Sequence, residues 1–402
     1  MKFENLERNR DNQQWVLDYL VKATGRSILF DHKERRYPES VLSYRMIPKH
    51  LARRAKHKEE LARCADAAGH RQTALELYFA AVQDYQEAQH VIFQDDNPQK
   101  LLYYDALNAC YDRIIELADY SIERVEVPWE GHSISCLLHL LPDRRKASCV
   151  LFIPGMDMIK EGFPKPIANA FIKRGLNCMV MDGPGQGISN IRKLRITDDN
   201  YERAASAVVN YLTARPEIDA SKIAACGIGT GTLWGMRLAA LDQRIAAVAT
   251  GSAAYGSKVP MFDMASPRYK QVFMYMSGIH DEAAFDEMAA RMTCLGYGSK
   301  IHCPTLMIVG EYDQVCFLED SLALYAEIAG PTEMWLLEDV SHQMNTLEGL
   351  GGLDAMPVMA DWVIDALNGK VNDKRIKVIR KARGNGPFDS GTPYLTDQEL
   401  YL

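Results

Sequence analysis

The sequence predicts an α/β protein with a mostly parallel, eight-stranded sheet that helices cover on both faces. Two observations support this class. From about residue 121 onward, short β-rich runs alternate with helical patterns, which is typical of a parallel sheet. Before that point the pattern is helical throughout. The predicted strands are 122–127, 133–141, 149–153, 177–181, 223–226, 246–250, 305–309 and 333–337. The predicted helices are 166–174, 201–214, 232–241, 318–329 and 356–367.

The N-terminal region, residues 1–119, is predicted to be a helical cap. Apolar residues recur at three- and four-residue spacing on both sides of Gly69-His70, which indicates two helices joined by a turn. A third helix is expected over residues 101–118. The first pair faintly resembles a tetratricopeptide repeat, but one pair is too few to form a solenoid. These helices are therefore expected to cover the α/β core, residues 120–369.

Two further segments stand out. Residues 259–299 interrupt the strand–helix alternation, are rich in Met and aromatic residues, and are predicted to form an inserted helical lid. Their Met and aromatic side chains either fill the core or face a ligand. Residues 370–402 are predicted to be a basic tail. Such a stretch is usually a solvated face or flexible arm, although it could also dock on an acidic partner or a second subunit.

Composition excludes several classes of function. The 402 residues are 47% hydrophobic and 25% charged, with a net charge of −7, which argues against nucleic acid and anionic membranes as partners. Apolar stretches are strand-sized and the N-terminus is polar, so neither a transmembrane helix nor a signal peptide is expected. The nine cysteines are scattered without a C-x-x-C pair. We expect a cytoplasmic homodimer without a metal or organic cofactor.

Gly229 occupies the central position of Gly227-Ile228-Gly229-Thr230-Gly231, between a predicted strand and a predicted helix. A strand, a glycine turn and a helix with G-x-S-x-G at the turn form the nucleophile elbow of α/β-hydrolases. Here glycine replaces the serine, which would preserve the sharp turn and remove the hydroxyl. The alternative, a phosphate-binding loop, lacks the G-x-G-x-x-G spacing.

Asp313 and His342 follow the last two predicted strands, at the edge where α/β sheets place their sites. An Asp at such a place either caps the next helix or orients a catalytic histidine. The order of elbow, Asp and His is the chain order of α/β-hydrolases, so we predict that Gly229, Asp313 and His342 occupy the three triad positions.

The loop after the third strand supplies the remaining candidates. We expect the backbone amides of Met156 and Thr230 to form an oxyanion hole. Asp157, Met261 and Phe262 are predicted substrate contacts. Asp182, in Asp182-Gly183-Pro184-Gly185, is interpreted as a structural turn residue.

These motifs resemble α/β-hydrolases, and more narrowly the group of 2,6-dihydroxypseudooxynicotine hydrolase and fungal hydrolases that shorten polyketide chains. The resemblance rests on 182–187, on Gly155-Met156-Asp157 with Lys160-Glu161, on Asp313 and His342, and on the helical stretch from residue 65 to Tyr85. It implies hydrolysis of a carbon–carbon bond next to a carbonyl on an aromatic or polyketide substrate. These relatives have serine where this chain has Gly229, although some members of the broader group, similar to the fermentation-respiration switch protein, also lack it. The glycine is either natural or an engineered replacement.

Three functions are therefore compatible with the sequence. The first is hydrolysis of a carbon–carbon or ester bond in an aromatic or polyketide-like molecule, impaired by the missing serine. The second is lyase, decarboxylase or cyclase chemistry with His342 as a general base and no covalent intermediate. The third is a non-catalytic protein that keeps the pocket, which we expect between the N-terminal helices and the lid and suited to a flat apolar molecule.

Overall fold

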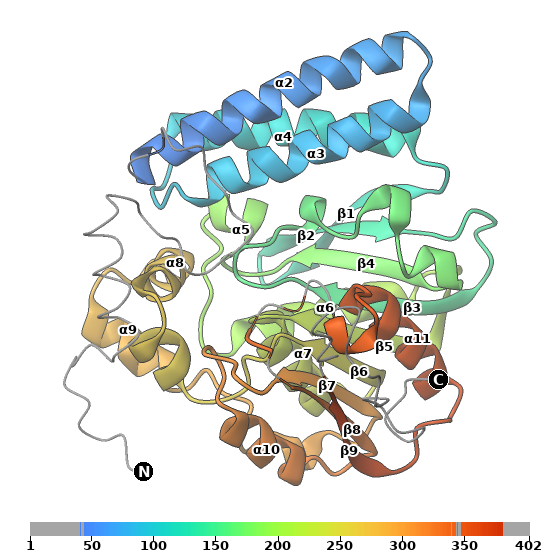
Figure 1. Ribbon diagram of the computed structural model, residues 1–402, viewed down its shortest axis with the longest axis vertical. Coiled ribbons are helices and arrows are strands. Elements are labelled where there is room, and N and C mark those ends of the chain that lie inside the picture. Colours follow the sequence, from blue (N-terminus) through green and yellow to red (C-terminus); the bar gives the residue numbers. More distant parts are fainter. Residues whose placement is uncertain (1–40, 42–43, 339, 343, 345–346, 381–402) are drawn as a thin grey trace, which may run out of the picture.

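The computed structural model describes residues 41, 44–338, 340–342, 344 and 347–380. The predictions for residues 1–40 of the cap and for residues 381–402 of the tail lie outside these residues. Two helices of 20 residues and one of 21 make up the described N-terminal region: α2 (Ile47–Ala67), α3 (Arg71–His90) and α4 (Pro98–Leu117). They form a layer above the end of the molecule that carries β1, β2 and α5 (Figure 1).

The core of the described chain is one nine-stranded sheet with the order β1-β2-β4-β3-β5-β6-β7-β8-β9. β1 and β2 pair antiparallel, as do β2 and β4, and all other pairs are parallel. The α/β class with a mostly parallel sheet is thus confirmed. The strands are β1 (Ile122–Trp129), β2 (His132–His139), β3 (Ala147–Ile153), β4 (Asn177–Asp182), β5 (Ile218–Ile228), β6 (Ile245–Gly251), β7 (Thr305–Gly310), β8 (Thr332–Leu337) and β9 (Lys374–Ile379).

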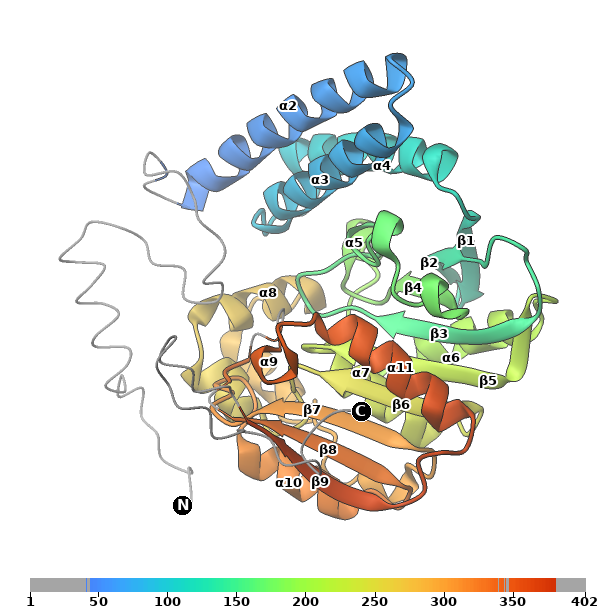
Figure 2. The same ribbon diagram turned by 45° about the vertical axis from the view of Figure 1, so that its right-hand side comes forward.

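Both faces of the central strands are buried, which explains their uninterrupted apolar sequences. Along β3, Leu151 and Ile153 join the hydrophobic cluster that includes helices α6 and α7. Val150 and Phe152 point to the other face and join the cluster that includes α11. Figure 2 shows α11 in front of the sheet. The helices that follow the strands are α5 (Gly187–Ile191), α6 (Asn200–Thr213), α7 (Gly231–Leu241), α10 (Leu318–Glu327) and α11 (Ala355–Leu367).

The insertion between β6 and β7 is helical. It contains the π-helical turn η5 (Val259–Met264), α8 (Pro267–Ser277), α9 (Glu282–Ala289) and the 3₁₀ turn η6 (Gly298–Lys300). The side chain of Ser266 caps α8 and that of Asp281 caps α9 by accepting backbone N–H groups. α8 lies below the end of the N-terminal helical layer (Figure 1), so the insertion and the cap face each other across one end of the sheet.

Two predicted elements differ from the structure. Residues 166–174 form two 3₁₀ turns, η3 (Pro166–Ala168) and η4 (Ile172–Arg174), instead of one helix. The side chain of Asn169 explains this, because its Oδ1 accepts the amides of Phe171 and Ile172 at 3.0 and 3.3 Å and thereby replaces helical hydrogen bonds.

The second difference is β9, a ninth strand in the segment assigned to the tail. It pairs parallel with β8, and Arg375 and Lys377 bind Glu333 of β8 at 2.6 and 3.1 Å. The basic residues alternate with apolar ones, and Ile379 is buried. The basic residues of this segment therefore belong to a strand, where they neutralise a buried carboxylate on the neighbouring strand.

Candidate active site

Gly229 lies in a sharp turn between β5 and α7. Its φ of +57° is in the left-handed region. Its N–H donates to the carbonyl of Gly251 at 3.2 Å, and its own carbonyl accepts the amide and the hydroxyl of Thr232 at 3.0 and 2.7 Å. Gly229 thus has the strand–turn–helix context of a nucleophile elbow.

The two flanking glycines are required by close packing, whereas Gly229 has space around it. A Cβ on Gly227 would lie 2.3 Å from the carbonyl oxygen of Gly231, and one on Gly231 would lie 2.1 Å from that of Ile153. A Cβ on Gly229 would meet only the Cα of Gly155, at 3.8 Å. The turn therefore excludes side chains at its flanks and leaves room for one at position 229.

Asp313 and His342 form a direct pair. Nδ1 of His342 lies 2.9 Å from Oδ2 and 3.1 Å from Oδ1 of Asp313. Asp313 is held by the amides of Val315 and Cys316, which donate to Oδ1 at 2.8 and 3.1 Å. The Asp313 side chain is 1% exposed and that of His342 is 14% exposed. A buried carboxylate thus orients an imidazole whose other nitrogen, Nε2, points away from it.

Hydrogen bonds made by the loop that carries His342 connect it to the elbow. β5, β6, β7 and β8 are parallel, so their carboxyl ends share one edge. The loop after β8 crosses the end of β7, where the amide of Tyr312 donates to Val340 at 3.0 Å. Further along that loop, the sulfur of Met344 accepts the amide of Ser252 at 3.2 Å, next to the Gly251 carbonyl that binds Gly229.

The predicted oxyanion loop lies against the elbow. A Cβ on Gly155 would be 3.0 Å from the carbonyl oxygen of Ile228, so a larger residue would push the loop slightly away from the elbow. Gln186 holds the loop by donating to the carbonyls of Pro154 and Gly155 at 3.2 and 2.7 Å. Within the described part of the chain, neither the Met156 nor the Thr230 amide donates to a protein acceptor. Both amides are therefore available at the elbow, as an oxyanion hole requires.

The predicted substrate contacts lie in different places. Asp157 accepts a hydrogen bond from Arg268 of α8 at 3.3 Å, which joins the oxyanion loop to the insertion. Phe262 packs edge-on against Phe273 and Phe285, with ring centroids 5.0 and 5.2 Å apart. Met261 is buried in the same hydrophobic cluster. Met261 and Phe262 thus belong to the interior of the insertion and do not line the pocket described next.

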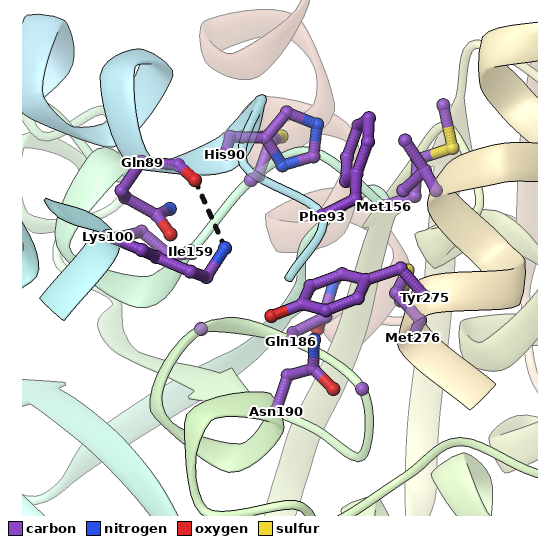
Figure 3. A pocket seen from close by; sticks show the side chains of 14 residues that line it. Gln89, His90, Phe93, Lys100, Met156, Ile159, Gln186, Asn190, Tyr275 and Met276 are labelled. Carbon is purple, nitrogen blue, oxygen red and sulfur yellow. Dashed lines mark hydrogen bonds between the residues drawn. The ribbon is translucent and has the colours of Figure 1, made fainter. Parts of the chain in front are cut away.

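A pocket opens between the N-terminal helices and α8, at the predicted place between the cap and the insertion (Figure 3). It encloses about 370 Å³, part of which is open solvent. Met156 is the predicted site residue that lines it, beside Phe93, Lys100, Asn190 and Tyr275; Gly229, Asp313 and His342 do not. The lining residues come from the cap, two loops, α5 and α8. No single stretch of sequence carried a pattern that could have identified them.

A buried charge cluster fastens the cap to the sheet. The ammonium of Lys160 lies 2.9 Å from Asp182 and 2.7 Å from Glu161, and 3.3 Å from the hydroxyl of Tyr104 on α4. Burial alone would lower the pKa of Lys160, but the two carboxylates raise it well above its ordinary value. Asp182 also accepts the amide of Ile188 at 3.1 Å. It is therefore a structural residue, and it binds the Lys160 ammonium as well as the residues of its own turn.

Among the described residues, no group of three or more His, Cys, Asp or Glu side chains is placed to hold a metal ion. No helix in the described ranges is long and apolar enough to cross a membrane.

Comparison with known proteins identifies the family to which the chain is related. A family model described as "Esterase FrsA-like" matches residues 37–280. The chain is similar to 2,6-dihydropseudooxynicotine hydrolase of Paenarthrobacter nicotinovorans, with 28% identity over 78% of this chain and 82% of the relative. It is also similar to the α/β hydrolase xenA of Xenoacremonium sinensis, with 27% identity over 59% of this chain and 57% of the relative.

Among solved structures, 2,6-dihydroxy-pseudo-oxynicotine hydrolase superposes with a TM-score of 0.73 at 23% identity, covering 89% of this chain and 98% of that one. AbyA5 superposes with a TM-score of 0.60 at 18% identity, covering 78% and 88%. These likenesses confirm the α/β-hydrolase fold, and the sequence matches confirm the resemblance to this group of hydrolases.

Proposed function

Because the chain belongs to the FrsA-like esterase family, whose relatives here are hydrolases, we propose that it hydrolyses an ester or a carbon–carbon bond next to a carbonyl. We further propose an aromatic or polyketide-like substrate. The observation that supports this most strongly is the 2.9 Å Asp313–His342 pair at the sheet edge that carries the elbow. The pocket between cap and insertion, with Phe93 and Tyr275 in its lining, suits a flat, partly apolar molecule.

The proposed mechanism uses three groups of this chain. His342, oriented by Asp313, takes a proton from the attacking nucleophile. The amides of Met156 and Thr230 stabilise the oxyanion that forms on the substrate carbonyl. With a serine at position 229, the nucleophile would be its hydroxyl. In the chain as it stands the nucleophile is water, which attacks the carbonyl directly while its proton passes to His342. Collapse of the tetrahedral oxyanion then breaks the ester C–O bond or the C–C bond, and His342 gives its proton to the leaving group. Without a serine hydroxyl this turnover is slow.

The test is to place the hydroxyl back. Gly229→Ser should raise turnover of 4-nitrophenyl butyrate or benzoylacetone by at least about 100-fold, since losing a triad nucleophile costs on the order of 10⁶. Gly229→Ala is the matched control, because it adds the same Cβ without a hydroxyl and should give no gain. A folded Gly229→Ser protein that gains nothing on either substrate would contradict the proposal.

A second candidate is lyase, decarboxylase or cyclase chemistry with His342 as the base and no covalent step. It is favoured by the retention of the Asp313–His342 pair and two unengaged amides beside a glycine. The two candidates predict opposite results, because Gly229→Ser would impair the lyase reaction and improve hydrolysis. Tight ligand binding without any His342-dependent turnover would instead support a non-catalytic role.

We also propose a reducing, cytoplasmic location. All nine cysteines are free thiols, which supports a compartment where disulfides do not form.

A further inference from the structure

The pocket contains one buried cation that the proposed mechanism does not use. Of the fourteen residues that line it, none is Asp or Glu, and Lys100 is the one Lys or Arg. His90 is the other lining residue that can carry charge, and its Nε2 lies 3.2 Å from Arg268. The charge that the lining offers to a ligand is therefore centred on Lys100.

Lys100 is held in place by backbone groups. The residue lies in the first turn of α4 and is 6% exposed. Its ammonium donates to the carbonyls of Gln89 and Ile92, both at 3.1 Å. Gln89 belongs to the last turn of α3, where the helix dipole stabilises a cation. The ammonium also lies 5.0 Å from the centre of the Tyr275 ring, which it faces in Figure 3.

These contacts leave one ammonium hydrogen uncommitted, since an ammonium donates three hydrogen bonds. No carboxylate of the described chain lies within ion-pair distance of Lys100. The nearby Asp95 forms an ion pair with Arg195 instead. The pKa of Lys100 is lowered to about 7. Burial is the main cause; the charge of Asp95 partly offsets it, and the charge of Arg195 lowers the pKa further. A buried cation without a counter-charge is costly, and an anion in the pocket would relieve that cost.

Asn190 provides a second donor in the same pocket. It is 4% exposed, and its Oδ1 accepts a hydrogen bond from Arg195. This contact uses the amide oxygen of Asn190 and leaves its NH₂ group to donate. The pocket thus presents a cation and an N–H donor beside an aromatic ring, a combination that matches an oxygen anion on a flat molecule.

We propose that this end of the pocket is a subsite for an acidic group of the substrate, a carboxylate or an ionised phenol or enol, which Lys100 binds with help from Asn190 and Tyr275. The inference rests on the proposed function in taking this pocket as the substrate pocket. It adds a substrate class, aromatic or polyketide-like organic anions, that the family assignment leaves open. A purely structural Lys100, which only ties α3 to α4, would give no preference for anions.

The experiment measures binding to the full chain by calorimetry at pH 6.5, below the Lys100 pKa of about 7, so that the ammonium form predominates. The carboxylate arm compares 2-naphthoate with the neutral 2-naphthamide. The phenolate arm compares 2,4-dinitrophenolate with 2,4-dinitroanisole. We expect the anion to bind about 10-fold more tightly in at least one arm, and the arm that shows the preference identifies the acidic group. Equal binding of anion and neutral analogue in both arms overturns the proposal without any variant.

Two variants assign the preference to Lys100. Lys100→Gln keeps a hydrogen-bond donor and removes the charge, and it should bring anion and neutral binding to within about 2-fold of each other. Lys193→Gln is the control, because Lys193 is an exposed cation paired with Asp96 outside the pocket lining; it should keep the preference. A folded Lys100→Gln protein that retains the preference, or a Lys193→Gln protein that loses it, overturns the assignment.

The result is separable from the proposed hydrolysis. If Gly229→Ser gains no activity but the anion preference depends on Lys100, the subsite is established and the hydrolase mechanism fails. If Gly229→Ser gains activity while neutral and anionic probes bind alike, the mechanism is supported and the subsite is refuted.

Discussion

The sheet edge and the pocket beneath the cap surround a basic side chain in opposite ways. At the sheet edge, the imidazole of His342 has its counter-charge built in, because Asp313 lies 2.9 Å away and is itself held by two amides. At the cap, the ammonium of Lys100 contacts two carbonyl oxygens and an aromatic ring, and no carboxylate of the described chain lies within ion-pair distance of it. The first arrangement suits a group that must take and return a proton. The second suits a group whose partner arrives with the ligand.

The largest expected effect comes from removing the imidazole of His342 at the sheet edge. In the Gly229→Ser background, His342→Ala should lower turnover of 4-nitrophenyl butyrate by roughly 10⁶-fold, because the hydroxyl then lacks its base. His132→Ala, at an exposed position on β2, is the control and should leave turnover unchanged. Retained activity in His342→Ala would mean that the base lies elsewhere.

The next effect separates orientation from proton transfer. Asp313→Asn in the same background should lower turnover by about 10⁴-fold, since the amide no longer fixes the imidazole tautomer or stabilises its charge. Binding of 2-naphthoate should not change, because Lys100 is independent of this pair. A fall in both turnover and 2-naphthoate binding would show that Asp313 and Lys100 are coupled, and it would contradict their independence.

A third prediction concerns the buried Lys160 cluster that fastens the cap to the sheet. Asp182→Asn leaves the buried Lys160 with one carboxylate fewer, and it should lower the free energy of unfolding by about 3–5 kcal/mol. Asp365→Asn breaks a solvent-exposed pair with Lys370 and should cost at most about 1 kcal/mol. Urea denaturation measures both. Similar losses from the two variants would show that the buried cluster does not hold the cap.

The smallest effect probes the elbow itself. Gly229→Ala should cost only about 1–2 kcal/mol, the strain of a left-handed backbone, because its Cβ meets nothing closer than 3.8 Å. Gly227→Ala should cost more than about 3 kcal/mol, since its Cβ would lie 2.3 Å from a carbonyl oxygen. Comparable losses in urea denaturation would contradict the proposed difference between these glycines.

The same two ends differ in how far the sequence could predict them. Gly229, Asp313 and His342 each follow their own strand closely, so local patterns placed all three at one sheet edge. The contact of Lys100 with Tyr275 joins residues that are 175 positions apart on helices of different layers. Such a pairing depends on how the cap docks, which short-range periodicity does not encode.

The errors in the fold have similar causes. The composition of residues 166–174 allows a helix, but the Asn169 side chain takes the amides that a helix would need. Arg375 and Lys377 give the sequence of β9 the character of a solvated tail, whereas their partner, Glu333, lies on a neighbouring strand. In both cases the contacts of one polar side chain, Asn169 or Glu333, decide the outcome.

The elbow geometry has an evolutionary consequence. The flanking glycines and the space at position 229 remain those of a turn that accepts a serine. A glycine codon of the form GGU or GGC becomes a serine codon by one base substitution. Where the codon for position 229 has that form, one base substitution would introduce the serine side chain without rebuilding the turn.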